Sequence, residues 1–174
     1  GEGAPAAEAA APELPEDVFV ARTARLQGRV SLGAGSSVLF CCELSAEGGP
    51  IVLVADSNIQ DNSVIRTRAE GVVIGRDTTI GHNVQIADCR IGARSLVGIG
   101  CVLAPGTVVA DDALVAAGAV TEPGQLLESG KLWGGRPARI LSELDDAKRA
   151  MMRVVVEGYR EHGRADRRLQ DGGG

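Results

Sequence analysis

Aliphatic residues recur at every sixth position over most of the chain, and this repeat is its dominant hydrophobic pattern. A period of six matches neither the 3.6-residue period of a helix nor the alternation of a long strand, but it suits a short strand followed by a tight turn. Three such units close one triangular coil, so the pattern predicts an all-β solenoid with the aliphatic side chains stacked inside. The repeated positions are Val20, Leu26, Leu32, Val38 and Leu44, then Leu53, Ile59 and Ile65, then Ile74, Ile80 and Ile86, and, after a one-residue contraction, Ile91, Val97, Leu103, Val109 and Val115.

A second position of the repeat, four residues after the aliphatic one, is small or is valine. The residue directly after the aliphatic one is often glycine, as at Gly75 and Gly81, and we expect it to relieve backbone strain at the corners. Aromatic residues make up only 2% of the chain, whereas sandwiches and helical bundles normally use rings to fill their cores. A β-sandwich with accidental spacing is the alternative fold, but it does not explain the phased runs. The small positions are Thr78, Val84, Ser95, Cys101, Thr107, Ala113 and Ala119.

Both ends of the chain depart from the repeat. Residues 1–17 are rich in Ala, Pro and Glu and predict a flexible tail, and the solenoid is expected to span residues 18–138. Residues 139–163 predict a C-terminal α-helix capped by Ser142, and residues 164–174 predict a second flexible tail. The apolar stripe of the helix is expected to comprise Leu144, Ala147, Met151, Val154 and Val155, and its first turn to be acidic through Glu143, Asp145 and Asp146.

The charge and the apolar runs limit the kinds of partner. A net charge of -5 argues against a general nucleic-acid binder, which needs clustered Lys and Arg. No apolar run approaches the roughly 20 residues that span a bilayer, so any membrane association is expected to go through a partner. The first residues lack the basic start and apolar core of a secretory signal and are too acidic for an intact organellar presequence, which leaves open a presequence that has been removed.

The four cysteines lie among apolar repeat positions without a CxxC pair. They are Cys41, Cys42, Cys89 and Cys101. We expect them to be buried free thiols in a reducing compartment. A soft-metal site is the less favoured alternative, because thiolate ligands usually come in close clusters.

Three motifs give the chain a resemblance to a known family. They are Asn-Ile-Gln-Asp-Asn at residues 58–62, Thr-Ile-Gly-His at residues 79–82 and Trp-Gly-Gly-x-Pro-Ala at residues 133–138. In order and spacing they resemble the γ-type carbonic anhydrase family, over about residues 50–160. The resemblance implies a left-handed parallel β-helix of hexapeptide repeats, against the usual right-handed crossover rule.

The resemblance also implies a zinc site, which this sequence does not complete. Active members of the family form trimers in which three histidines hold zinc between subunits, and the zinc activates a water to attack carbon dioxide. The first histidine position holds Arg66, the second holds His82 and the third holds Ala87. Arginine does not deprotonate to bind a metal and alanine has no donor atom, so the chain alone is expected to hold no cofactor and no catalytic residue. The other histidine, His162, lies beyond the solenoid.

The polar residues of the family site are partly retained. Asn58, Gln60 and Asp61 match family residues near the metal, and the favoured interpretation is that they satisfy backbone groups at a corner. In family members the histidine at the position of His82 is donated across the subunit interface. His82 is therefore either the single ligand that this chain gives to a neighbouring subunit's zinc site or an inert surface residue. The family's Arg-Gly-Asp stretch is missing, and residues 40–51 read FCCELSAEGGPI instead.

The leading functional hypothesis is a catalytically inactive structural subunit. Residues 129–162 most resemble the carbonic-anhydrase-like subunits of mitochondrial respiratory complex I, where a trimer of homologous subunits sits against the matrix side of the membrane arm. The alternatives are a stand-alone homotrimer in the bacterial cytoplasm and an enzyme. The enzyme would be a zinc carbonic anhydrase with an unusual ligand set or a hexapeptide acyltransferase with His82 as base.

Overall fold

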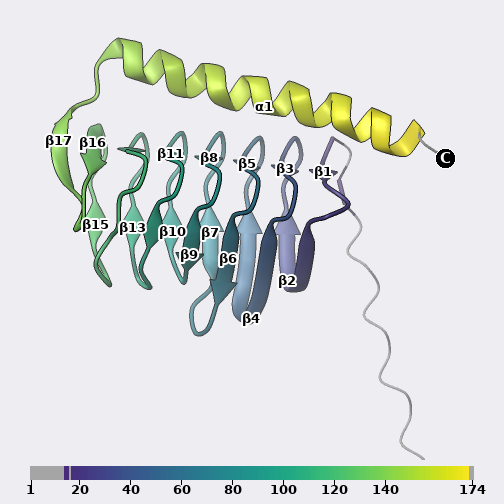
Figure 1. The fold of residues 1–174 in the computed structure, drawn as a ribbon, viewed down its shortest axis with the longest axis horizontal. Helices are drawn as coiled ribbons and strands as arrows, with labels where there is room; N and C mark the ends of the chain where they lie inside the picture. Colours follow the sequence, from purple (N-terminus) through teal and green to yellow (C-terminus); the bar gives the residue numbers. More distant parts are fainter. Residues whose placement is uncertain (1–13, 16, 173–174) are drawn as a thin grey trace, which may run out of the picture.

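The structure is a computed structural model that describes residues 14–15 and 17–172. The chain coils into a parallel β-solenoid of about six turns, and one long helix, α1 (Asp146–Gly172), lies along its whole length (Figure 1). Most of the predicted tail at residues 1–17 lies outside the described residues. No described helix is both long enough and apolar enough to cross a membrane.

Each coil contributes strands to three faces, and equivalent strands of successive coils pair in parallel. The first face, covered by α1, consists of β1 (Phe19–Val20), β3 (Ser37–Val38), β5 (Asn58–Ile59), β8 (Thr79–Ile80), β11 (Leu96–Val97), β14 (Leu114–Val115) and β16 (Lys131–Gly134). The solenoid ends where β16 pairs antiparallel with β17 (Arg139–Glu143). Residues 139–143, predicted to be helical, therefore form an edge strand.

The other two faces are joined because two long strands, β2 (Arg25–Leu32) and β4 (Glu43–Leu53), run from one face onto the next. The first halves of these strands, with β6 (Val64–Thr67), β9 (Gln85–Ala87) and β12 (Val102–Leu103), form what we call the Arg66 face. The second halves, with β7 (Val72–Ile74), β10 (Arg90–Ile91), β13 (Val108–Val109) and β15 (Leu126–Leu127), form the third face.

The predicted aliphatic ladder is the core of the solenoid. Val20 and Leu26 are half-buried, and every other repeated aliphatic residue is buried. Ile59, Ile65 and Ile80 have no exposed surface at all. Removing a side chain of this size from water contributes about 1.5–3 kcal/mol, so the stacked ladder supplies the main stabilisation. The solenoid prediction is confirmed, and the sandwich alternative is wrong.

The glycines that follow the aliphatic positions serve a purpose other than the one expected. Gly75 and Gly98 are not among the residues with positive φ. A Cβ at Gly75 would lie 2.5 Å from the Ala93 nitrogen, and one at Gly98 would lie 2.6 Å from the Ala117 nitrogen. These glycines let adjacent coils approach, a contact between residues about one coil apart that the local sequence does not reveal. The left-handed corner positions are held in part by other glycines, such as Gly100 and Gly118, and in part by polar residues, including Asp56, Asn62, Asp77, Asn83, Arg94 and Asp112, with φ between 52° and 63°.

The small polar residues of the repeat satisfy the backbone at one corner. Ser57 donates its hydroxyl to the Gly75 carbonyl at 2.6 Å and accepts the Thr78 N–H at 3.2 Å. The Thr78 and Ser95 hydroxyls continue the column, each donating at 2.9 Å to a carbonyl of the next coil. Buried backbone groups need such partners because an unmade hydrogen bond is costly. The repeat therefore encodes hydrogen bonds between coils as well as packing.

Three of the four cysteines behave as predicted. Cys42, Cys89 and Cys101 are buried free thiols, whereas Cys41 is exposed. Burial raises the pKa of Cys42 and of Cys89 to about 11, so both stay protonated at neutral pH. The expectation of burial was wrong for Cys41 because this residue occupies a left-handed corner position, with φ 59°, where side chains point outward.

The helix α1 starts later and ends later than predicted. Asp145 caps it, since its carboxylate accepts the Lys148 N–H at 2.8 Å, while the predicted cap, Ser142, pairs with Leu132 in the β16–β17 hairpin. The helix continues through residues 164–172, which were expected to form a tail. Gln170 anchors that end, because its side chain donates to the Val20 carbonyl at 3.1 Å and its own carbonyl accepts from Arg22 at 2.7 Å. These contacts join opposite ends of the chain, and no local pattern encodes them.

The face of α1 that packs on the solenoid also differs from the predicted stripe. Met152 and Val156 are buried, whereas Met151 is 43% exposed and Val154 is 68% exposed. Met152 packs with Leu114 and with Leu144, which precedes the helix. The prediction placed Leu144 inside the helix, and this error shifted the phase of the stripe. The buried face is formed by Met152, Val156, Tyr159 and Gly163, of which Tyr159 is half-buried.

Asp88 stabilises the turn before β7. Its carboxylate accepts the N–H groups of Arg68 at 3.1 Å and Gly71 at 3.1 Å, together with those of Ala69 and Glu70. Burial alone would raise the pKa of Asp88, but these backbone donors outweigh it and hold the pKa below its ordinary value. The stabilisation is therefore present above the unfolded-state pKa of about 3.9 and is lost as the pH falls through the lower folded-state value.

Asp88→Asn should lower the free energy of unfolding by about 1 kcal/mol at pH 7, because the amide keeps the acceptor oxygen but loses the charge. Asparagine tolerates the left-handed backbone at this position, where φ is 44°. Urea unfolding of the two proteins between pH 3 and 7 measures the difference, which should shrink towards zero below about pH 4. A difference that stays constant with pH would show that the charge is not involved.

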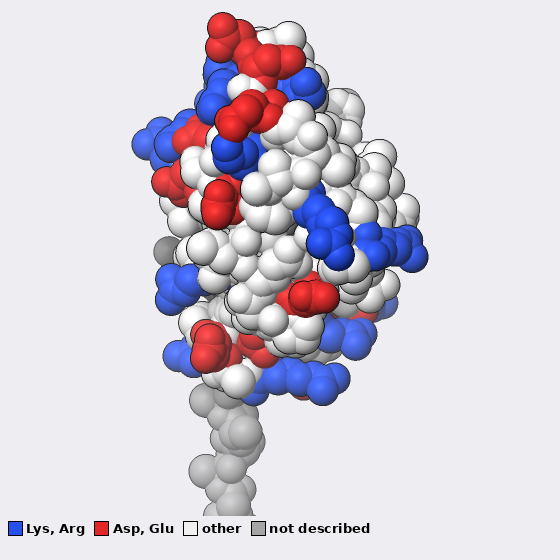
Figure 2. All heavy atoms as spheres, turned by 90° about the vertical axis from the view of Figure 1, so that its left-hand side faces the viewer, with Lys and Arg blue, Asp and Glu red and all other residues white. Residues whose placement is uncertain are grey.

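Charged side chains are interspersed on the surface. Viewed from the β17 end, Lys and Arg alternate with Asp and Glu, and a broad area between them is uncharged (Figure 2). The exposed large apolar residues of β15 and β17 are Leu126, Ile140 and Leu141. This face shows no block of one charge sign of the kind that nucleic-acid binding requires.

Candidate functional site

The two altered metal positions lie side by side on the Arg66 face. Arg66 in β6 and Ala87 in β9 are register partners on adjacent parallel strands. Adjacent strands are about 4.8 Å apart, so side chains at these two positions could reach one ion. The sequence motifs placed these residues in one site, and the register agrees with that placement. Neither side chain offers a donor atom to a metal, because Arg66 is a cation and Ala87 ends in a methyl group.

An ion pair stands where the family has its first histidine. The Arg66 guanidinium lies 3.6 Å from the Glu43 carboxylate, and both side chains are about half exposed. Glu43 belongs to the segment 40–51 that replaces the family's Arg-Gly-Asp stretch. Arg66 and the replaced segment, the two departures from the family pattern, are therefore in contact. Nothing in the sequence indicated that they would pair. An exposed pair of this kind adds at most about 1 kcal/mol.

His82 lies at the adjoining corner, in the turn between β8 and β9. The side chain is partly exposed, but its Nδ1 atom is buried and has no hydrogen-bond partner among the described residues. Successive coils place Phe40, Asp61 and Ile99 at the same corner, as the hydrogen bonds between those turns show. Phe40 is 42% exposed and Ile99 is 56% exposed. His82 thus projects from a partly apolar ridge rather than from a pocket of its own chain.

The retained polar residues form a network beside this corner. Asn58 donates to the Thr79 hydroxyl at 3.0 Å, and Gln60 donates to the Asn58 side-chain oxygen at 3.2 Å. Asp61 accepts the Phe40 N–H at 3.3 Å. Asn58 and Gln60 are buried, at 1% and 5% exposure. The structure supports a structural role for Asp61 at the corner, whereas Asn58 and Gln60 bind each other and a neighbouring side chain rather than the backbone.

The helix contributes a residue that the sequence did not single out. Tyr159 packs against the cluster of Phe19, Ala21 and Leu39, and it lies close enough to Asp61 to feel its charge. Burial, and then the nearby Asp61 carboxylate, raises the pKa of Tyr159 above its ordinary value. Tyr159 could have been found from its helical spacing to Met152 and Val156. The predicted stripe ran instead along the face of Met151 and Val154.

The residues do not fit a zinc ion within one chain. In the described part of the chain, no three side chains of His, Cys, Asp or Glu gather closely enough to hold a metal. At the family's ligand positions only His82 offers an imidazole. We therefore derive no catalytic step through zinc for this chain by itself.

Comparison with known proteins identifies the family. The scan against protein-family models found no match. The chain is 41% identical to "Gamma carbonic anhydrase 3, mitochondrial" of Arabidopsis thaliana over 85% of this chain and 60% of that protein. It is 36% identical to a carbonic anhydrase of Geobacillus kaustophilus, over 91% of this chain and 88% of the relative. The chain belongs to the γ-type carbonic anhydrase family.

The chain is also similar to a bacterial protein with a different name. The carnitine operon protein CaiE of Salmonella is 30% identical over 86% of the chain. The chain spans 56% to 60% of the length of the three Arabidopsis mitochondrial relatives, so those proteins contain further sequence. The family thus includes proteins with mitochondrial names and proteins of bacteria.

Solved structures confirm the fold. A hexapeptide transferase family protein from Anaplasma phagocytophilum superposes with a TM-score of 0.83 at 30% identity, covering 87% of this chain and 90% of that one. A structure described as a putative acetyltransferase of Bacillus cereus gives a TM-score of 0.85 at 25% identity, covering 89% of this chain and 91% of that one. The predicted left-handed parallel β-helix with a C-terminal helix is confirmed.

Proposed function

We propose that this γ-carbonic-anhydrase-like chain is a catalytically inactive structural subunit of a trimer with homologous subunits. The observation that carries the proposal is the pairing of Arg66 and Ala87 at the two ligand positions that one chain must supply. A cation and a methyl group there remove two of three metal donors while the strands that bear them stay intact. The chain thus keeps the fold that a trimer needs and lacks the donor atoms that catalysis needs.

The proposed location is the matrix side of the mitochondrial complex I membrane arm. Support comes from the resemblance of residues 129–162 to subunits of that assembly and from the mitochondrial names of three relatives. Native mass spectrometry of the assembled protein tests the location. The chain should be detected in one complex with respiratory subunits and homologous chains.

The purified chain should contain far less than one zinc per chain and should not accelerate carbon dioxide hydration, because a single imidazole is too few for a stable zinc site. Elemental analysis and stopped-flow hydration measure the two properties. The control is an intact relative with all three histidines, purified in the same way. A full zinc equivalent with hydration activity in this chain would contradict the proposal.

His82 is proposed to complete a zinc site that belongs to a neighbouring subunit. Its partly exposed side chain lies at a corner where Phe40 and Ile99 are also exposed, and this position supports a role outside its own chain. In a mixed trimer with intact relatives, His82→Ala should remove one zinc from the partner without unfolding either chain. His162→Ala is the matched control and should leave the zinc unchanged. If both variants keep the full zinc content, His82 is a surface residue only.

A stand-alone bacterial homotrimer is the second candidate. The similarity to the Geobacillus carbonic anhydrase, at 36% identity over 91% of this chain, supports it. Native mass spectrometry separates the two candidates, since a homotrimer would appear without respiratory subunits. In a homotrimer His82 would face Arg66 and Ala87 of an identical chain and would have no zinc to complete.

A further inference from the structure

We propose that a cavity between α1 and the solenoid binds a small organic anion with a short aliphatic tail, such as a medium-chain carboxylate. The cavity has a volume of about 230 Å³ and lies where α1 crosses the corner of Asp77, Arg94 and Asp112. It is separate from the positions of Arg66, Ala87 and His82, none of which lines it. The proposal does not depend on the proposed function.

The floor of the cavity is apolar. Leu144, Met152 and Val156 line it, and all three are buried. Leu144 and Met152 belong to the cluster that joins α1 to Leu114 on the first face. An aliphatic chain in contact with these side chains would be removed from water at a gain of about 0.8 kcal/mol per CH₂ group. The floor therefore suits a short alkyl tail.

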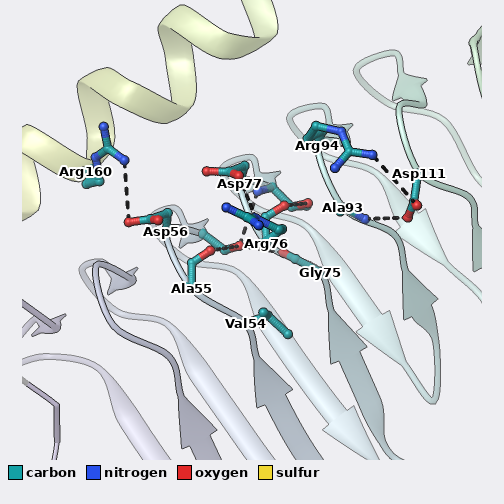
Figure 3. A network of polar contacts seen from close by, with 12 residues as sticks. Val54, Ala55, Asp56, Gly75, Arg76, Asp77, Ala93, Arg94, Asp111 and Arg160 are labelled. Atoms are coloured by element: carbon teal, nitrogen blue, oxygen red, sulfur yellow. Dashed lines mark hydrogen bonds and ion pairs between the residues drawn. The ribbon is translucent and has the colours of Figure 1, made fainter.

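The corner acids are already neutralised by arginines. Asp112 accepts two hydrogen bonds from Arg94, at 3.0 Å and 3.1 Å. Asp77 pairs with Arg76 at 3.1 Å, and Asp56 pairs with Arg160 at 3.6 Å (Figure 3). These carboxylates are consequently not available to balance further cations on the helix.

Two of the three arginines that α1 contributes to the cavity form no ion pair with the described residues. Arg149 and Arg153 line the cavity and form no ion pair with any described residue. Arg160 reaches Asp56 with one terminal nitrogen, but its Nε is buried and lacks an acceptor. A buried donor without a partner is rare in native proteins and often marks a missing ion or ligand. The oxygens of a carboxylate could satisfy these guanidinium groups in a charge-assisted contact.

One acidic group in the cavity should weaken the binding of an anion, so its removal tests whether charge governs binding. Glu157 lines the same cavity and forms no ion pair with the described residues. Counting all charged lining groups, four arginines face three carboxylates, so the cavity carries a net charge of +1. Removing Glu157 should strengthen anion binding, and removing the unpaired arginines should weaken it.

The experiment is isothermal titration of the full chain with sodium octanoate at low salt. One site per chain is expected, weakened about tenfold or more by Arg149→Gln with Arg153→Gln and strengthened a few-fold by Glu157→Gln. Arg168→Gln is the matched control, because Arg168 is exposed on the same helix and does not line the cavity. Octanamide tests the charge and acetate tests the tail, and both should bind at least tenfold more weakly than octanoate.

Four results would overturn the proposal: no octanoate binding at millimolar concentration, no loss in the double arginine variant, octanamide binding equal to octanoate, or acetate binding equal to octanoate. The arginine and glutamate substitutions lie on the rim and leave the apolar floor intact. Circular dichroism of each variant checks that α1 remains docked. A second readout is the melting temperature, which octanoate should raise in the wild-type chain and not in the double arginine variant.

Discussion

Arg66→His combined with Ala87→His is expected to give a trimer of this chain about one zinc ion per subunit interface, where the wild-type chain should hold almost none. The two new imidazoles would stand on register partners of adjacent strands. His82 of the neighbouring subunit would supply the third ligand, as the family does. Elemental analysis of the purified trimer measures the gain. Zinc content is the readout because the family's Arg-Gly-Asp stretch is also absent, so hydration need not return with the metal.

The controls for this experiment test whether all three imidazole ligands are needed for zinc binding. Each single variant adds only one imidazole, and the triple variant with His82→Ala keeps the new pair but removes the donated ligand. All three should hold clearly less zinc than the double variant, because a stable zinc site in proteins uses at least three protein ligands. A double variant that stays trimeric yet binds no zinc would show that the interface geometry, and not only the two substitutions, differs from that of active relatives.

Met152→Glu is expected to lower the free energy of unfolding by about 3 kcal/mol or more, because the carboxylate would replace a thioether that is 8% exposed and packed on Leu114 and Leu144. Urea denaturation measures the loss. Helix α1 should detach first, since its contacts with the first face are the ones disturbed. The loss should exceed that of any single substitution on the outer side of the helix.

Met151→Glu is the matched control, since it places the same group one residue away at a position that is 43% exposed. It should change stability by no more than about 0.5 kcal/mol. If Met152→Glu does not yield folded protein, Met152→Ala should still cost about 2 kcal/mol through the cavity it leaves. Equal losses for the two glutamate variants would mean that α1 does not pack through the Met152 face.

The repeat could be predicted from the sequence because its information is local and redundant. Each coil restates the same requirement, an aliphatic residue such as Ile59, Ile80 or Val97 at one phase, so a single irregular unit does not hide the pattern. Burial of these residues then follows from the coil geometry. The motifs around Asn58 and His82 likewise indicated the family, because their spacing is read along one strand or turn.

The contacts of individual residues could not be predicted from the sequence, because their partners lie on neighbouring coils. Arg66 was predicted as a lost ligand, but its partner Glu43 lies on the preceding coil, and the contact at 3.6 Å exists only once the coils stack. The reason for Gly75 is similar, since the nitrogen that a side chain there would strike belongs to Ala93 of the next coil. Sequence reasoning assigned Gly75 to backbone strain because that is the only local explanation.

The sequence by itself predicted a hexapeptide solenoid with a helix after it, which the structure confirms, whereas the change at two of three metal positions stays a prediction from the family motifs. Only the tertiary structure decided where α1 begins, which face it buries and how far it extends. The run from Met151 to Val156 offers apolar residues to two faces of a helix, so local hydrophobicity does not choose between them. The choice is made by packing against Leu114 and by hydrogen bonds between Gln170 and the first coil, contacts between segments that are distant in the sequence.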